Sequence, residues 1–234
     1  MKKLRVLDLF SGIGGFSLGL ERTGGFETVA FCEIEEFPRK VLAKHWPEVP
    51  IYEDVRQLHG MLGSVDVICG GFPCQPYSTA SSGKRKGAAD DRALWPEMLR
   101  LIRQVRPAWV IGENVAGIAS MDLERVVSDL EAIGYSQQPL DIPAGAVGHD
   151  HRRARFWFIG HTDRDGKSIR AEYGEASRLF YRGSQRKRLG KADGLSRKLD
   201  ADRNRMKALG NAVVPQIPEM IGRAILEAEA ARQS

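Results

Sequence analysis

Long apolar runs and cysteines are both scarce in this chain of 234 residues. No stretch approaches the roughly 18–20 consecutive apolar residues that cross a bilayer, which argues against a transmembrane segment. The basic residues at the start are followed too soon by Asp8 for a secretory signal peptide. Three cysteines are too few for a secreted disulfide framework, so we expect a soluble protein of a reducing cytoplasm.

The sequence also lacks the glycine spacing G-x-G-x-x-G of a dinucleotide-binding loop. Its first glycine-rich turn, Gly12-x-Gly14-Gly15, follows an apolar run and precedes a helical pattern. Such a turn lets the backbone approach a ligand closely, and the helix start that follows favours polar or anionic groups. A dehydrogenase is therefore disfavoured, while a different nucleoside cofactor stays open.

Positive charge is unevenly distributed along the chain. Residues 152–207 hold 17 Lys and Arg against 7 Asp and Glu, a local net charge of +10, whereas the whole chain carries +5. A basic segment on an acidic body suggests a polyanionic partner such as nucleic acid. A solvated basic surface is the alternative interpretation.

Strand-like and helix-like patterns alternate along most of the chain. Apolar, β-branched or aromatic runs predict strands at residues 4–10, 26–32, 65–69, 107–111 and 156–159. Helical spacing of apolar residues predicts helices at residues 16–22, 34–46, 93–105, 123–133 and 217–231. This alternation predicts an α/β fold with a largely parallel sheet.

Two carboxylates stand where strands of that sheet are expected to end. Glu33 follows the second strand, a place where a carboxylate of an open α/β fold can take both hydroxyls of a ribose. Asp54 follows Ile51 and Tyr52, where a third strand is expected to end. Together with the glycine-rich turn they predict a nucleoside pocket, although each alone is more typical of a surface carboxylate.

Cys74 lies in the sequence Gly71-Phe72-Pro73-Cys74-Gln75, directly after an apolar strand. Two prolines, Pro73 and Pro76, restrain this loop at the edge of the sheet where ligands bind, and a thiolate there is a candidate nucleophile. Cys32 and Cys69 lie inside apolar strands and are expected to be inert core residues. The cysteines have no convincing partners for a metal site, so we expect no metal.

Ionisable side chains also flank two further strands, after one and before the other. Glu113 comes after the strand at 107–111 and is a candidate acid, with a loop or capping carboxylate as the alternative. Arg153 and Arg155 enter the late strand and share one face of it by the period of two. They are candidates for gripping a phosphate or the polar groups of the site, or else form a basic strand end on the surface.

These residues, in this order, resemble the cytosine-5 DNA methyltransferase family. Asp8-Leu9-Phe10-Ser11-Gly12-Ile13-Gly14-Gly15-Phe16 looks like its S-adenosylmethionine loop, and Leu209-Gly210-Asn211-Ala212-Val213-Val214-Pro215 looks like its last motif. Pro73-Cys74-Gln75 resembles the nucleophile loop, Glu113-Asn114-Val115 the acid motif, and Arg153-x-Arg155 the arginine motif. The residue after Glu33 is often aromatic in the family, and here it is Ile34.

The resemblance implies a Rossmann-like methyltransferase fold and specific roles for these residues. Cys74 would attack C6 of cytosine, Glu113 would hold N3 and N4 of the base, and Arg155 would bind O2 with Arg153 steadying the loop. The residues it implies for S-adenosylmethionine are Phe10, Ser11, Gly12, Gly14, Gly15, Glu33, Asp54, Leu94, Asn211 and Val213. The base must leave the duplex before it reacts.

The resemblance also divides the chain into two parts. Residues 1–159 plus 207–234 would form the catalytic and cofactor-binding domain, and residues 160–206 a recognition region that is short for the family. We expect double-stranded DNA as the partner, a monomer without membrane contact in the cytoplasm of a bacterial or phage-infected cell, and a cognate restriction endonuclease in the same system. A tRNA cytosine-5 methyltransferase and a catalytically silent DNA-binding relative are the alternatives.

Overall fold

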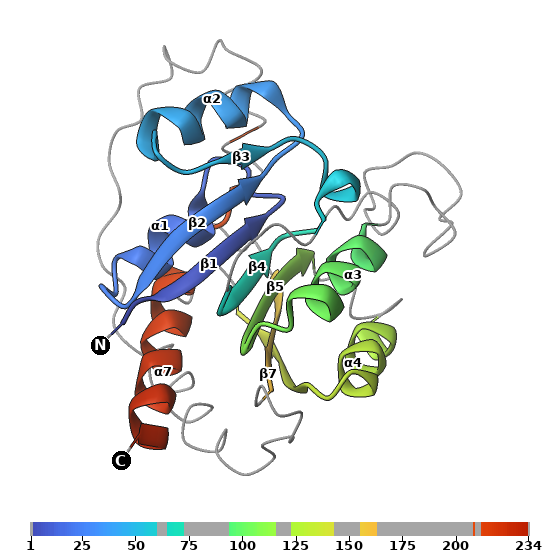
Figure 1. The fold of residues 1–234 in the computed structure, drawn as a ribbon. Helices are drawn as coiled ribbons and strands as arrows, with labels where there is room; N and C mark the ends of the chain where they lie inside the picture. The colour runs from blue at the N-terminus through green and yellow to red at the C-terminus, as the bar shows by residue number, and fades with distance from the viewer. Residues whose placement is uncertain are drawn as a thin grey trace.

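The structure is a computed structural model that describes residues 2–59, 65–72, 94–115, 123–142, 155–162, 208 and 212–233. Within these ranges the chain forms one seven-stranded sheet with helices on both faces (Figure 1). The strands are β1 (Leu4–Leu9), β2 (Phe26–Cys32), β3 (Ile51–Tyr52), β4 (Val67–Gly70), β5 (Trp109–Val115), β6 (Ser136–Asp141) and β7 (Arg155–His161). The helices are α1 (Gly15–Glu21), α2 (Glu36–His45), the 3-10 turn η1 (Val55–Gln57), α3 (Trp95–Val105), α4 (Leu123–Ala132) and α7 (Gln216–Gln233).

The strand order is β3-β2-β1-β4-β5-β7-β6. Strands β1 to β5 pair in parallel with one another, whereas β7 runs antiparallel to both β5 and β6. The connection from β3 returns past β1 to reach β4, so the order reverses between β1 and β4. Ligands of open α/β sheets bind at such a reversal, outside the carboxyl ends of the strands. The predicted α/β fold with a largely parallel sheet is confirmed.

Alternating side chains of the strands build a core on each face of the sheet. Phe16 and Leu20 of α1 and Ile221 of α7 are buried on one face, among side chains that include Trp157 of β7. The opposite face is covered by α3 and α4, whose buried residues pack near Phe158, the next residue of the same strand. A period-two strand presents successive side chains to opposite faces, which is why β7 carries an unbroken aromatic and apolar run.

The structure adds a strand that the sequence pattern did not predict. β6 is the last strand at one edge of the sheet, and it contains Pro139. Proline cannot donate to a strand partner, which weakens a sequence-based strand prediction, but an edge position tolerates it. Strand β7 is also longer than the predicted 156–159 and reaches His161. Apart from residues 160–162, the predicted recognition region lies outside the described residues.

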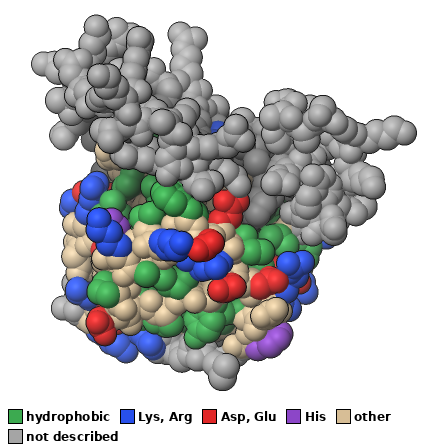
Figure 2. All heavy atoms as spheres, turned by 90° about the horizontal axis from the view of Figure 1, so that it is seen from above, with side chains coloured by type: hydrophobic (Ala, Val, Ile, Leu, Met, Phe, Trp, Pro, Cys, Tyr) green, Lys and Arg blue, Asp and Glu red, His purple; other side chains and the backbone are tan. Residues whose placement is uncertain are grey.

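Charges of both signs are mixed on the face of the molecule that Figure 2 shows. Figure 2 shows Lys and Arg side chains interspersed with Asp and Glu, with apolar side chains between them. Most of the basic stretch 152–207 lies outside the described residues. Where the structure describes the chain, no helix combines the length and the apolar character needed to span a membrane.

Candidate active site

The carboxyl ends of the parallel strands bring the candidate residues to one edge of the sheet. Cys32 at the end of β2 is paired with Tyr52 at the end of β3, so Glu33 and Asp54 follow neighbouring strand ends. The first turn follows β1, and Gly71 follows β4. The prediction that Glu113 comes after a strand ending at residue 111 is wrong, because β5 runs on to Val115 and Glu113 lies within it, near its carboxyl end. Because the strands run in parallel, residues from five separate stretches of sequence are brought to the same edge.

The turn after β1 is tightly wound and locally strained. Ser11 donates its hydroxyl to the carbonyl of Asp8 at 2.6 Å, and its backbone N–H donates to the carbonyl of Cys32 at 3.1 Å. Gly12 and Gly14 have φ of 53° and 83°, which glycine adopts without steric cost. Phe10 also has φ of 53°, a left-handed conformation that a residue with a Cβ adopts only at a cost. Strain of this kind is typical of functional loops.

The Glu33 carboxylate is held by backbone donors on both of its oxygens. Oε2 accepts the N–H of Gly12 and Oε1 accepts the N–H of Glu35, each at 2.7 Å. The residue is 8% exposed. Each carboxylate oxygen can accept a second hydrogen bond, so Glu33 keeps capacity for a ligand diol while the Gly12 contact ties it to the first turn. The adjacent Ile34 side chain is 63% exposed, which is unusual for a large apolar group.

Asp54 caps the turn η1 and carries an arginine partner. Its Oδ1 accepts the backbone N–H of Arg56 at 3.0 Å, and Arg56 Nε lies 3.0 Å and 3.2 Å from its two oxygens. These contacts lower the pKa of Asp54 below its usual value, because the arginine hydrogen bonds favour the charged form. Asp54 is therefore a carboxylate at neutral pH and can accept hydrogen bonds from a ligand.

Arg39 on α2 joins the loops that carry Glu33 and Asp54. Its Nη1 donates to the carbonyls of Glu33 and Ile34 at 3.3 Å and 2.5 Å. Its Nη2 lies 3.2 Å from a carboxylate oxygen of Glu53. One side chain thus fixes the relative positions of the two loops, a role that no local sequence pattern indicated.

Asp8 lies beneath the first turn and is completely buried. Its Oδ2 accepts the hydroxyl and the backbone N–H of Ser17 at 2.8 Å and 3.3 Å, which connects β1 to the start of α1. Its Oδ1 has no hydrogen-bond partner. Burial raises the pKa of Asp8 to about 7, and the nearby Glu33 charge acts in the same direction. Asp8 is thus the least satisfied carboxyl group that the structure describes at this edge.

Glu113 and Arg155 form an ion pair across strands β5 and β7. Arg155 Nε lies 2.6 Å from Glu113 Oε1, and the two side chains are 19% and 14% exposed. The antiparallel pairing brings the end of β5 beside the start of β7. A Cβ added to Gly71 would lie 3.0 Å from Glu113 Oε2, so the backbone after β4 passes directly beside this carboxylate. Gly71 precedes Cys74 by three residues in the sequence.

Asn114 fixes the chain that leads toward Cys74. Its buried side chain donates to the carbonyl of Phe72 at 3.1 Å. Phe72 in turn packs against Trp95 and Phe158, with ring centroids 5.5 Å and 6.3 Å away. The last described residue before Cys74 is therefore anchored by a hydrogen bond and by an aromatic cluster. The motif was noted in the sequence, but this partner of Asn114 was not predictable.

The two remaining described cofactor candidates border the same region. Leu94 is the residue before α3 and packs against the buried cluster that contains Trp95. A Cβ added to Gly15 would lie 2.5 Å from the Val213 carbonyl oxygen, so the start of α1 and the segment before α7 are in close contact. The predicted return of the C-terminal motif to the first turn is therefore observed at Val213.

Three further candidates, Cys74, Arg153 and Asn211, lie outside the described residues. Cys32 and Cys69 are 2% and 0% exposed, which confirms them as core residues. Burial raises the pKa of Cys32 to about 12 and that of Cys69 well above its usual value. Both thiols are therefore protonated. Among the described residues no group of three or more His, Cys, Asp or Glu is placed to hold a metal ion.

The strand order and the reversal between β1 and β4 define a Rossmann-like, open α/β protein with its candidate site at the carboxyl ends of the strands. A family model described as C-5 cytosine-specific DNA methylase matches residues 4–204. The chain belongs to that family.

Curated relatives share about a third of the aligned residues. The chain is 35% identical over 192 residues to the type II methylase M.HgiEI of Herpetosiphon aurantiacus, covering 77% of this chain and 43% of that protein. It is 34% identical over 161 residues to the type II methyltransferase M.HhaI of Haemophilus parahaemolyticus, covering 67% and 48%. The chain therefore spans less than half the length of these curated relatives.

Solved structures agree on the fold. A prophage-encoded Escherichia coli protein, described as a candidate DNA modification methyltransferase, has a TM-score of 0.57 and 28% identity, over 68% of this chain and 47% of that one. The Dnmt2 methyltransferase of S. pombe has a TM-score of 0.61 at 19% identity, over 82% and 58% of the two chains. At 19% identity, the similarity to the S. pombe protein supports the fold alone.

Proposed function

We propose that this chain transfers a methyl group from S-adenosylmethionine to C5 of a cytosine in DNA, through a covalent bond between Cys74 and C6. The observation that carries the proposal is the partly buried pair of Glu113 and Arg155 beside Gly71. A carboxyl group and a guanidinium at this spacing match the N3, N4 and O2 edge of a cytosine ring. Cys74 follows Gly71 by only three residues, so the nucleophile loop starts beside this pair.

The residues of the first three strand ends fit the proposed cofactor. Glu33 has acceptor capacity for a ribose diol, and because it also accepts the N–H of Gly12, it would hold such a diol beside the first turn. Asp54 is ionised and accepts hydrogen bonds, which suits the exocyclic amino group of adenine. The exposed Ile34 side chain offers an apolar surface for the adenine face. When bound, S-adenosylmethionine supplies an electrophilic methyl group on its sulfonium sulfur.

Cys74 would convert an unreactive ring into a nucleophile. Its thiolate adds to C6 of cytosine, which breaks the aromaticity of the ring and makes C5 electron-rich enough to accept the methyl group. Loss of the C5 proton and departure of the Cys74 thiolate then restore the ring and the free cysteine. Cys32 and Cys69 are unsuited to this role, since both are buried and protonated.

Glu113 would stabilise the charge that develops on the base during this addition. In the described structure Arg155 Nε lies 2.6 Å from Glu113 Oε1. The acid role requires a proton from solvent on Glu113, which it would share with N3 of the base. Arg155 keeps further N–H groups that can donate to O2 of the base.

The target base must leave the helix, because C5 and C6 are inaccessible inside stacked DNA. Unstacking one base costs a few kcal/mol. Strand β7 includes residues 160 and 161 of the predicted recognition region, so we assign recognition of the surrounding sequence to the rest of it, residues 163–206, whose arginines suit phosphates and guanine edges. A monomer acting on double-stranded DNA in the cytoplasm, with a cognate restriction endonuclease, remains our expectation.

A radiolabelled methyl donor tests the proposal directly. The purified chain is incubated with methyl-tritiated S-adenosylmethionine and duplex DNA, and label in 5-methylcytosine is measured. Transfer to tRNA but not to DNA in a competition assay would replace the proposed substrate. Absence of transfer to either, with a folded protein, would contradict the activity.

Trapping of the covalent adduct tests the nucleophile. DNA that contains 5-fluorocytosine should form an adduct that survives denaturation, since fluorine cannot leave C5 as a proton does. Cys74→Ser should abolish the adduct and methyl transfer while cofactor binding survives, because an alcohol is almost un-ionised at neutral pH. Cys69→Ser is the matched control and should keep the adduct. An adduct that maps to Cys32 or Cys69 would refute the assignment.

A further inference from the structure

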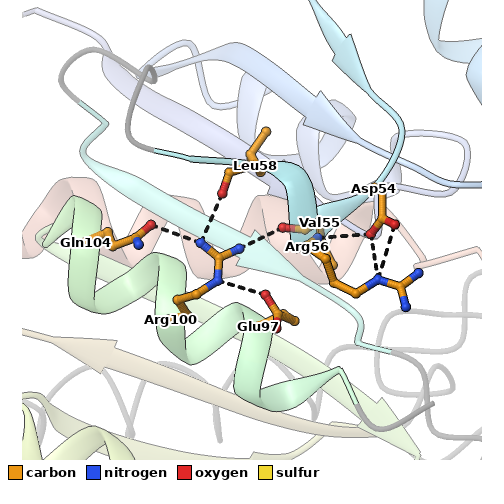
Figure 3. A network of polar contacts seen from close by, with 7 residues as sticks. All are labelled: Asp54, Val55, Arg56, Leu58, Glu97, Arg100 and Gln104. Carbon is orange, nitrogen blue, oxygen red and sulfur yellow. Dashed lines mark hydrogen bonds and ion pairs between the residues drawn. The ribbon is translucent and has the colours of Figure 1, made fainter. Parts of the chain in front are cut away.

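Arg100 on α3 holds the turn that follows Asp54. Its Nη2 donates to the carbonyl of Val55 at 2.9 Å, and its Nη1 donates to the carbonyl of Leu58 at 3.0 Å (Figure 3). These carbonyls lie 45 and 42 residues away in the sequence. The contact joins a long helix on one face of the sheet to the short connection after β3.

Arg100 is itself fixed in place by its own helix. Its Nε lies 2.8 Å from an oxygen of Glu97, and its Nη1 also donates to Gln104 at 3.0 Å. Helix α3 is anchored by fully buried side chains, among them Met98 and Ile102. Because several of its N–H groups are hydrogen-bonded and its helix is well packed, the Arg100 side chain is held in one position, unlike a mobile surface arginine.

The turn that Arg100 holds is the one that Asp54 caps. Asp54 accepts the N–H of Arg56, and the carbonyl of Val55 also accepts the N–H of Leu58. Val55 is the first residue of η1 and Leu58 follows its last, so Arg100 binds both ends of the turn. A single 3-10 turn is too short to be rigid alone. The position of the Asp54 carboxylate therefore depends on Arg100 through the backbone.

We propose that Arg100 is a positioning residue that aims the Asp54 carboxylate at the exocyclic amino group of the cofactor's adenine, and so sets the preference of the site for adenine over hypoxanthine. The inference rests on the proposed function, in which Asp54 reads the adenine. Arg100 lies outside the motifs that form the cofactor pocket, and it acts on Asp54 through the carbonyl groups of Val55 and Leu58.

The chemistry of the two bases makes the preference measurable. Adenine presents an N–H donor at position 6, which a carboxylate accepts, whereas hypoxanthine presents a carbonyl oxygen that a carboxylate repels. A hydrogen bond to a charged group is worth a factor of roughly ten or more in affinity when it is well aligned. Misalignment of the carboxylate loses the favourable contact with adenine and relaxes the repulsion of hypoxanthine, so the ratio of affinities falls toward one.

The test compares S-adenosylhomocysteine with S-inosylhomocysteine by calorimetric titration of the full chain. The wild type should bind the adenine compound about tenfold or more tightly. Arg100→Met keeps the aliphatic stem but removes every N–H donor, and should bring the ratio close to one. Arg100→Lys retains one donor group and should give an intermediate ratio, which keeps the test informative if Arg100→Met does not fold.

Two controls separate positioning from general damage. Arg103→Met removes an exposed arginine from the same helix and should leave the ratio unchanged. Ile102→Val weakens the core beneath α3, so it should lower the melting temperature without altering the ratio. Asp54→Ala should itself abolish the preference, and adding Arg100→Met to it should cause no further change in either affinity.

The outcomes separate the positioning role from the proposed function. If the wild type binds neither compound, the proposed cofactor is wrong and the positioning role is overturned with it. If the wild type binds both equally, Asp54 does not read the base and the positioning role is overturned while methyl transfer stands. If the wild type discriminates and Arg100→Met discriminates equally well, the positioning role alone is overturned.

Discussion

The two ends of the sheet differ in how their polar side chains are paired. One end is formed by the carboxyl ends of the parallel strands, and the other lies at the opposite side of the same sheet. At the carboxyl ends, Asp8 keeps a buried oxygen without a hydrogen-bond partner, and Phe10 holds a strained φ. At the opposite end, Trp109 donates to Glu229 at 2.9 Å, and the ring of His161 packs on Trp109 with centroids 4.2 Å apart. Strain and unsatisfied groups occur at both ends, because Arg106 just before β5 has φ of 50° and Gln137 Oε1 in β6 is buried without a partner among the described residues. The ends differ in that the carboxyl ends collect the ionisable candidate residues, whereas the polar side chains named at the opposite end are paired with one another.

The opposite end uses its polar side chains to close the fold. Arg232 on α7 contacts His161 of β7, and Glu229 on the same helix accepts the hydrogen bond from Trp109 of β5, so the last helix is fastened to both strands. Tyr135 donates its hydroxyl to the carbonyl of Pro107 at 2.6 Å. Burial and the nearby Arg232 lower the pKa of His161 to about 4, so this histidine is neutral at physiological pH. The contrast implies that changes at the opposite end alter stability alone, whereas changes at the carboxyl ends alter the chemistry or, at the buried Asp8, the pH dependence of stability.

Glu113→Gln should have the largest effect on the reaction. Glutamine keeps an acceptor for Arg155 but has no transferable proton, so kcat for methyl transfer should fall by roughly 10²–10⁴. The free energy of unfolding should change little. Glu229→Gln at the opposite end is the control and should keep kcat within about twofold. An equal loss of kcat in the two variants would contradict the proposed difference between the two ends of the sheet.

Asp8→Asn should change how stability depends on pH. The folded-state pKa of Asp8 is about 7 against 3.8 for the ordinary group, so the folded protein binds this proton more tightly. Its contribution to stability is complete below about pH 4 and is lost as pH rises to about 7, a change of about 4 kcal/mol. Asparagine keeps an acceptor for Ser17 but does not titrate.

Urea unfolding of both proteins between about pH 4 and pH 8 measures this difference. The wild type should lose stability relative to Asp8→Asn as the pH rises, and the two curves should run in parallel above about pH 7. Other carboxylates titrate in both proteins and cancel in the comparison. A constant difference across the whole range would show that Asp8 is ionised throughout.

Glu33→Ala should remove most of the protection that the cofactor product gives against heat. S-adenosylhomocysteine at about a hundred times its Kd stabilises a protein by about 2.7 kcal/mol. Without the carboxylate, both the diol contact and the tie to Gly12 are lost. Glu27→Ala, at an exposed position of β2, is the control and should retain the shift in Tm. Full protection in Glu33→Ala would move the ribose contact elsewhere.

Trp109→Phe should have the smallest effect, and only on stability. The change removes the hydrogen bond to Glu229 at the end of the sheet opposite the candidate active site, at a cost of about 1–2 kcal/mol. Methyl transfer and the affinity for S-adenosylhomocysteine should stay at wild-type values when measured well below Tm. A loss of activity comparable to that of Glu113→Gln would mean that the two ends are coupled.

The sequence alone was sufficient for the order of all strands and α-helices except β6 and for several ionisable residues at their ends. Apolar periodicity predicts the helices and most of the strands, because burial on one or both faces leaves a repeating local pattern. Glu33, Asp54 and Glu113 were candidates because each directly follows or ends such a pattern. Strand β6 was not predicted from the sequence. An edge strand is covered on fewer sides and pairs through only part of its N–H groups, so it has no continuous apolar run and tolerates Pro139, which is atypical of a strand.

The partners of these residues were decided only by the tertiary structure. Arg155 forms an ion pair with Glu113. The side chains of Asn114 and Arg100 donate hydrogen bonds to the backbone carbonyls of Phe72 and Val55, respectively. In each of these contacts the two residues are far apart in the sequence. Such contacts leave no local periodicity, since the acceptor is often a backbone carbonyl that every residue possesses. The sequence therefore determined which chemical groups stand at the carboxyl edge of the sheet. The packing of strands and helices determined how those groups are paired, buried and aimed, because both the parallel register and the low-dielectric interior exist only once the chain has folded.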